Sequence, residues 1–179
     1  MRDKIGQLVN INRFHNLTKL LRVTALITKA AVSFKNQVTD KKSTKKELIK
    51  LSATDLKEAE NLWIRSVKTS SFSKEIAFRL SKDHSSTPPK YVTKFGLYLD
   101  EKMIKCKGRL NNASLPVKTR NPVLMPAKHE FTHLLIKQSH ESVKHNGIRD
   151  TLTTLRERYL VLRGQEVVKK IISSCVDCH

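Results

Sequence analysis

The stretch "SHESVKHNGIRDTL", residues 139–152, places two of the seven histidines in the chain five positions apart. On one continuous helix with about 3.6 residues per turn, His140 and His145 would point roughly 140° apart and could not share a face. The Asn146-Gly147 pair tolerates positive φ, and an apolar stripe at helical spacing resumes directly after it. The stretch therefore predicts a helix that ends near His140, a corner that contains His145, and a second helix beyond that corner.

A cysteine pair further along the chain supplies two more ligands of the kind that binds zinc. The four residues form the pattern His140-x4-His145-x29-Cys175-x2-Cys178. Two thiolates at this spacing in a turn point to one side, and two imidazoles complete a tetrahedral set with no position left for water. We expect one structural Zn²⁺ that joins the surrounding helices and hydrolyses nothing. The alternative is that the histidines lie at the surface and the cysteines form a buried or redox dithiol.

Apolar periodicity places helices on both sides of this pattern. A long amphipathic helix is predicted from Leu17 to Val38, and a second from Ser52 to Val67 with a capping box formed by Ser52 and Asp55. The one tryptophan, Trp63, falls on the apolar side of the second helix and is expected in the core. Three shorter helical patterns follow near the C-terminus, over residues 129–140, 148–159 and 165–173.

The middle of the chain has a different pattern. Phe95, Leu97 and Leu99 alternate with polar residues, which predicts a β-hairpin in which Cys106 is buried and inert. The segment "NPVLMP", residues 121–126, is a short apolar run between prolines and predicts an edge strand. We expect a mainly α chain with a small β-hairpin. Its predicted segments are a long amphipathic helix with a lysine-rich connection (1–50), a helical connection (51–90), a hairpin with an edge strand (91–128) and a zinc-binding unit (129–179).

The net charge points to a polyanionic partner. The chain has 35 lysines and arginines against 16 acidic residues, a formal charge of +19. Such an excess favours binding to nucleic acid through counterion release, and an anionic membrane surface is the second choice. The alternative without a specific partner is a solvated, lysine-rich surface. No apolar stretch is long enough to span a bilayer, so we expect a soluble, intracellular protein. The residues expected to contact DNA, mainly at phosphates, are Lys41, Lys42, Lys45, Lys46, Arg149, Arg156 and Arg158.

The order of the four metal ligands resembles the His-His-Cys-Cys zinc-binding domain of retroviral and retrotransposon integrases. Upstream, "EAENLWIRSVK", "KFGLYLDEKMIKCKGRLNNASLP" and "PVLMPAKHEFTHLLIKQSH" are similar, in that order, to the segment before integrase in Pao/BEL retrotransposon polyproteins. The resemblance covers most of residues 13–178. It implies a three-helix unit related to helix-turn-helix. It also implies DNA binding and assembly of the chain with itself or with integrase subunits. The expected location of the protein is intracellular and includes the nucleus.

The sequence also departs from that family. The chain has Tyr159-Leu160-Val161 where Tyr-Trp-Ile is common, so one core aromatic is missing. The three carboxylates of the integrase catalytic core would lie beyond Cys178. The resemblance therefore implies a non-catalytic polyprotein fragment that cannot join DNA ends by itself.

Two other functions fit parts of the sequence. A zinc-dependent DNA-binding regulatory protein is the main alternative, with helix 148–159 as its recognition helix. The pentapeptide "HEFTH", residues 129–133, matches the H-E-x-x-H motif of zinc metalloproteases, in which Glu130 would be the general base. Pro126, however, places His129 in the first turn of its helix, and the further ligands of a metzincin do not follow. A helix start with two partly exposed histidines is the simpler reading.

Overall fold

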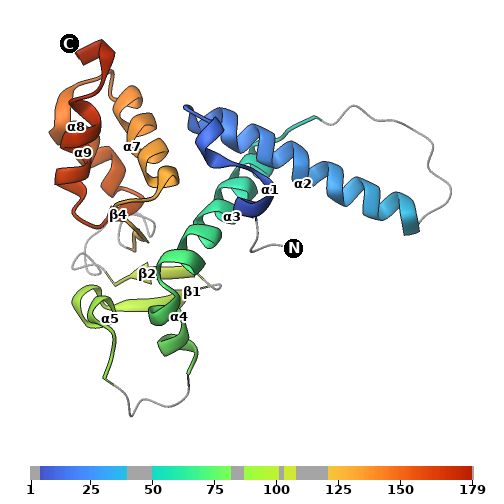
Figure 1. Cartoon of the computed structure of the whole chain (residues 1–179), viewed down its shortest axis with the longest axis horizontal. Helices are drawn as coiled ribbons and strands as arrows, with labels where there is room; N and C mark the ends of the chain where they lie inside the picture. Colours follow the sequence, from blue (N-terminus) through green and yellow to red (C-terminus); the bar gives the residue numbers. More distant parts are fainter. Residues whose placement is uncertain (1–4, 40–49, 82–86, 101–102, 108–120, 179) are drawn as a thin grey trace. The chain divides into compact units, whose positions relative to one another are not determined.

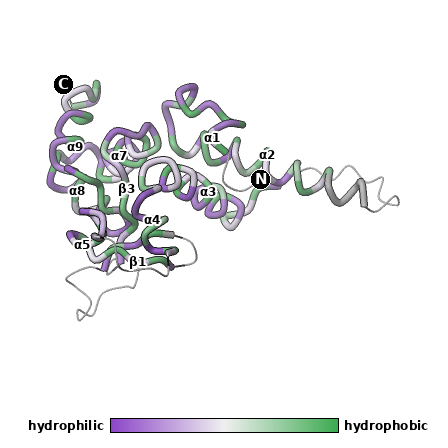
Figure 2. The backbone as a smooth tube through the Cα atoms, turned by 60° about the horizontal axis from the view of Figure 1, so that its bottom comes forward, coloured by the Kyte–Doolittle hydropathy of each residue, from purple (hydrophilic) through white to green (hydrophobic). Residues whose placement is uncertain are grey.

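A computed structural model describes residues 5–39, 50–81, 87–100, 103–107 and 121–178. They form a mostly helical chain with one small sheet, which confirms the predicted fold class. The chain divides into two compact units, Met1–Ile64 and Arg65–His179. Figure 2 shows hydrophobic and hydrophilic residues alternating along the helices. None of the helices in the described part of the chain is long and apolar enough to cross a membrane.

The first unit contains the long helix that the sequence predicts. After α1 (Ile5–Leu8) and a 3-10 turn (Ile11–Arg13), α2 runs over Leu17–Thr39. Helix α3 (Ala53–Ser71) follows and belongs to this unit up to Ile64. Trp63 is buried, as expected, and its indole N–H donates to the Thr24 hydroxyl at 2.9 Å. This bond satisfies a buried donor and ties α3 to α2.

The capping box at the start of α3 is present. The Asp55 backbone N–H donates to the Ser52 hydroxyl at 3.2 Å, and the Ser52 backbone N–H donates to the Asp55 carboxylate at 2.7 Å. Lys29 of α2 pairs with the same carboxylate at 3.0 Å. These contacts, the Ser52 backbone N–H first, lower the pKa of Asp55 to about 2.

The second unit holds a four-stranded sheet in the order β1-β2-β3-β4. Its strands are β1 (Leu97–Asp100), β2 (Met103–Cys106), β3 (Val123–Met125) and β4 (Tyr159–Val161). The hairpin β1–β2 is antiparallel as predicted, and Cys106 is buried in it. The segment "NPVLMP" does form a strand, but β3 is internal, because it pairs antiparallel with β2 and parallel with β4. The flanking prolines stay outside the three residues that pair, so neither removes a ladder donor.

Three helical details differ from the sequence predictions. Phe95 ends a short helix, α5 (Lys90–Phe95), because Gly96 takes a left-handed conformation at φ 54° and turns the chain into β1. A separate helix, α4 (Ser73–Leu80), follows α3. Tyr159 lies in β4 rather than at the end of a helix over 148–159, so Arg158 also falls beyond the helix.

All three predicted C-terminal helices are present, the second of them shorter than predicted. They are α7 (Glu130–Ser142), α8 (Gly147–Arg156) and α9 (Gly164–Ile172), and each packs against the other two. Figure 1 shows them as the orange-to-red bundle, with β4 joining α8 to α9. A last 3-10 turn, η2 (Val176–Cys178), follows α9. The bundle thus brings the end of α7 and the chain after α9 to the same end of the unit.

Candidate metal centre

The corner between α7 and α8 is built from left-handed residues. Lys144 and His145 have φ of 54° and 61°, and Gly147 has φ of 80°. Asn146, which the sequence suggested as the break, keeps φ at −75°. Two consecutive non-glycine residues in this region cost free energy, so the corner depends on its tertiary contacts. A local backbone bond also closes the corner, since the His145 N–H donates to the His140 carbonyl at 3.1 Å.

His140 lies on the inner face of the last turn of α7 and is 3% exposed. Its Nε2 lies 3.1 Å from the Sγ of Cys178. Its Nδ1 lies 3.0 Å from the hydroxyl oxygen of Thr151 on α8. Burial lowers the pKa of His140 below its ordinary value, and the neighbouring His145 lowers it further. The neutral imidazole that this favours is the form that binds a metal.

His145, in the corner, faces the two sulfurs through Nδ1, whereas His140 faces the Sγ of Cys178 through Nε2. Its Nδ1 lies 3.3 Å from the Sγ of Cys175 and 3.9 Å from the Sγ of Cys178. The two imidazole rings meet edge to face, with centroids 4.6 Å apart. The Nε2 of His145 points away from the sulfurs and lies 3.4 Å from the Asp177 carboxylate.

The four ligand atoms of His140, His145, Cys175 and Cys178 all lie within 4.8 Å of one another. Bond lengths of about 2.0–2.1 Å to nitrogen and about 2.3 Å to sulfur imply ligand separations of roughly 3.3–3.8 Å in a tetrahedral zinc site. The observed spacing fits this set after small movements. Two imidazoles and two thiols are also the donors that zinc prefers. The group is therefore compatible with one zinc ion, which agrees with the cofactor expected from the sequence.

The protonation of the thiols makes metal binding at this site depend on pH. Partial desolvation raises the pKa of Cys178, and the adjacent Cys175 raises it further. Without metal, this thiol therefore holds its proton at neutral pH. A zinc ion displaces such protons, so binding at this site releases them and weakens as the pH falls.

The H-E-x-x-H histidines do not meet in this way. The Nδ1 of His129 accepts a hydrogen bond from the Phe131 N–H at 3.0 Å and caps α7, while the Nδ1 of His133 faces the Glu130 carboxylate at 3.4 Å. Burial lowers the pKa of His129. The pentapeptide therefore begins a helix, and neither of its histidines belongs to the His-Cys group.

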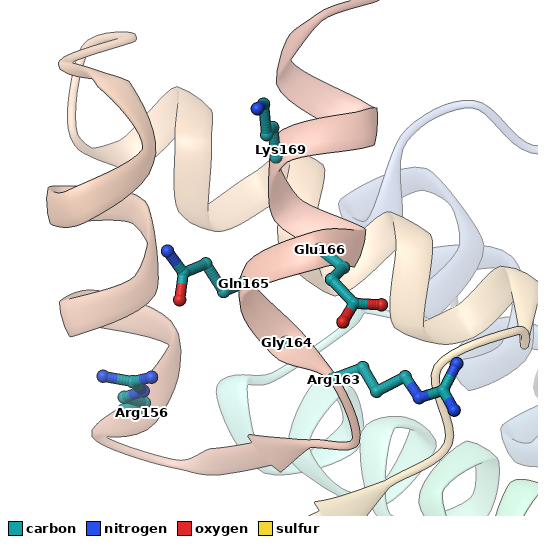
Figure 3. Close-up of a pocket in the computed structure, with 6 residues that line it drawn as sticks. All are labelled: Arg156, Arg163, Gly164, Gln165, Glu166 and Lys169. Carbon is teal, nitrogen blue, oxygen red and sulfur yellow. The ribbon is translucent and has the colours of Figure 1, made fainter.

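The predicted DNA-contact residues are only partly within the described chain. Lys41, Lys42, Lys45 and Lys46 lie outside the described residues. Arg149 and Arg156 are exposed on α8, and the Arg158 guanidinium lies 5.2 Å from the centroid of the Tyr159 ring. Figure 3 shows Arg156 at a hollow beside the first turn of α9, which Arg163, Gly164, Gln165, Glu166 and Lys169 also line.

Sequence reasoning did not identify the residues behind the ligands. Thr151 contacts His140 and Asp177 contacts His145. A signal for Thr151 existed, because helical spacing from Leu155 places this hydroxyl on the apolar face of its helix. A polar residue on an inward face needs a partner, and the nearby histidine provides one.

One comparison with known proteins found a match in this part of the chain. Residues 127–179 match the family model of the integrase zinc binding domain. The matched range contains all four residues of the His-Cys group. Searches of curated proteins and of solved structures found no match.

Proposed function

We propose that residues 127–179 form an integrase-type zinc domain in which His140, His145, Cys175 and Cys178 bind one structural Zn²⁺. The observation that carries this proposal is the convergence of the four ligand atoms within 4.8 Å, at the one point where the α7–α8 corner meets the chain after α9. Four protein ligands leave no open position for water, so the ion would hold the fold together and would not catalyse a reaction.

We further propose that the chain binds DNA mainly through phosphates. The formal charge of +19 supplies the attraction, and Arg149 and Arg156 are exposed on α8, the helix that follows the His145 corner. Arg163 and Lys169 also line the hollow beside α9, together with one acidic residue, Glu166. Residues 1–50 carry twelve basic and three acidic side chains, whereas residues 121–179 carry nine and six. The larger share of the affinity would therefore come from the N-terminal part, Lys41, Lys42, Lys45 and Lys46 included.

The parent context we propose is a Pao/BEL-type retrotransposon polyprotein, with the zinc domain as a scaffold for assembly with itself or with integrase subunits. The match over residues 127–179 and the resemblance of the upstream segments support this context. It implies an intracellular, nuclear site of action. The second candidate is a zinc-dependent DNA-binding regulator, which the exposed arginines of α8 favour. A regulator would prefer one DNA sequence strongly, whereas phosphate binding would not.

The test of the zinc proposal is metal content by native mass spectrometry. We expect one zinc ion in the purified protein, its loss in His140→Ala and in Cys175→Ser, and its retention in His129→Ala. The last variant is the matched control, because His129 lies on the same helical segment and is a ligand only in the protease reading. Loss of zinc in His129→Ala together with retention in the other two would overturn the proposal and support the protease.

A further inference from the structure

The contacts around Thr151 determine which nitrogen of His140 carries a proton. The Thr151 hydroxyl lies 2.7 Å from the Gly147 carbonyl oxygen, one helical turn earlier. A carbonyl only accepts, so the single hydroxyl proton points at Gly147. The Thr151 oxygen also lies 3.0 Å from the Nδ1 of His140, and both residues are buried. Because the hydroxyl has no second proton to give, the oxygen accepts and His140 Nδ1 donates.

This assignment leaves the other nitrogen free for a metal. A neutral imidazole has one N–H, so a proton on Nδ1 leaves Nε2 with its lone pair exposed. That Nε2 faces the Sγ of Cys178 at 3.1 Å. The opposite tautomer would direct an N–H into the group of ligands and would leave two acceptors, Nδ1 and the threonine oxygen, facing each other.

We propose that Thr151 is a positioning residue of the metal centre, whose hydroxyl oxygen holds the Nδ1 proton of His140 and so directs the unprotonated Nε2 at the zinc. This inference rests on the proposed zinc site and adds a residue outside its four ligands. Partners of this kind fix the tautomer and the ring orientation of ligating histidines, and their loss typically weakens metal binding by about 10–100-fold.

The two histidines are oriented differently. His145 faces the sulfurs through Nδ1, and its Nε2 lies 3.4 Å from the Asp177 carboxylate. The Asp177 side chain is 74% exposed, so water competes for this contact. The Thr151 hydroxyl is buried and has no such competitor. Thr151 therefore contributes more to zinc affinity than Asp177 does.

Helix α8 offers a matched control for the threonine. Thr153 donates its hydroxyl proton to the Arg149 carbonyl at 3.0 Å, the same one-turn contact that Thr151 makes with Gly147, but it is exposed and touches no imidazole. We expect Thr151→Val to weaken zinc binding by about 10-fold or more, measured by competition with a chelating dye. The zinc affinities of Thr153→Val and Thr151→Ser are expected to stay within about threefold of the wild type. The zinc affinity of Asp177→Asn should lie between theirs and that of Thr151→Val.

The tautomer itself is measured separately in the zinc-loaded wild-type protein. Long-range ¹H–¹⁵N spectra are expected to give a protonated Nδ1 and a metal-bound Nε2 for His140, and the reverse for His145. Ligation of His140 through Nδ1, or equal zinc affinities for the two valine variants, would overturn the role of Thr151 while the zinc site stands. A wild-type protein that binds no zinc would instead overturn the proposed function. If Thr151→Val does not fold, the wild-type spectrum alone decides.

Discussion

The Nδ1 of His145 lies 3.3 Å from the Sγ of Cys175, although the two residues are thirty positions apart in the sequence. This contact joins the left-handed corner after α7 to the turn after α9. Leu155 of α8 and Val168 of α9 are buried, but the corner and η2 themselves are exposed or half-buried. Apolar burial therefore stabilises the middle of the bundle, and we expect the end that carries the four candidate ligands to depend more on a bound metal.

Removal of the metal is expected to destabilise this unit. A ligand that binds only the folded state adds about 2.7 kcal/mol to the free energy of unfolding at a concentration 100 times its Kd. Chelation should therefore lower the midpoint of thermal unfolding, followed by circular dichroism, and re-addition of zinc should restore it. Trp63 bonds to Thr24 within the first unit, so its emission serves as a control that should not follow the metal. An unchanged midpoint would argue against a structural ion.

The corner offers a second measurable property. Lys144 is exposed and has φ of 54°, a conformation that costs a non-glycine residue about 1–2 kcal/mol. Glycine removes this cost but loses about 0.5–1 kcal/mol through the entropy of the unfolded chain. Lys144→Gly should therefore raise the free energy of unfolding by about 0.5–1 kcal/mol, measured by urea unfolding of the zinc-loaded protein.

The matched control for the corner is Lys144→Ala. Alanine removes the same charge and side chain but keeps the left-handed strain, so the free energy of unfolding should stay within about 0.5 kcal/mol of the wild type. Equal stabilisation by alanine and glycine would assign the effect to the lost charge rather than to the backbone.

The helices of the candidate site were readable from the sequence because their apolar spacing is regular. The break between His140 and His145 was readable for the same reason, since two ligands five positions apart cannot share a helix face. Its backbone conformation was predicted only in part. Gly147 has positive φ, as expected from the Asn146-Gly147 pair, but Asn146 does not, and Lys144 and His145 take positive φ although their intrinsic preference for it is lower. Local preference is overridden where a group of side chains fixes the backbone.

Strand β4 was missed for a different reason. Tyr159 lies four positions after Leu155, so it continues the apolar stripe of α8, and only its pairing with Val123 of β3 distinguishes a strand from another turn of helix. Parallel pairing joins segments that are distant in sequence and leaves little local pattern.

The burial of Lys68 also depends on a distant segment, strand β2, which supplies the carbonyl that Lys68 contacts.

That buried lysine predicts a dependence of stability on pH. Lys68 is 2% exposed and donates to the Ile104 carbonyl. Burial lowers its pKa to about 7, while Cys106 raises it and Lys105 lowers it to smaller extents. Between the folded value and the ordinary value of 10.5, the unfolded chain binds more protons than the folded chain. The contribution of Lys68 to stability therefore falls as the pH falls from about 10 to about 7, and is constant below that.

Lys68→Met should remove this dependence. We expect the variant to exceed the wild type in stability at pH 7 by on the order of 2–4 kcal/mol and to lose this advantage near pH 10. Urea unfolding at a series of pH values measures the difference. Lys74→Met, an exposed lysine on α4, is the matched control and should leave the pH profile unchanged. A constant difference between Lys68→Met and wild type across this range would mean that Lys68 stays charged in the folded state.

Binding to DNA should depend strongly on salt. Each phosphate that the protein neutralises adds about −0.9 to the slope of log K against log salt concentration. We expect Arg156→Ala to reduce the magnitude of that slope by about one, equally on unrelated duplexes, because the contact proposed for it is with phosphate. Arg79→Ala removes the same charge from α4, outside the predicted contact residues, and should change the slope less. The largest reduction in the slope is expected for the variant in which four lysines become alanine together, namely Lys41, Lys42, Lys45 and Lys46.

An affinity that scarcely changes between low and physiological salt would contradict the phosphate proposal. A preference of about 10³-fold or more for one sequence, on the other hand, would favour the regulator, since selectivity of that size needs contacts to base edges.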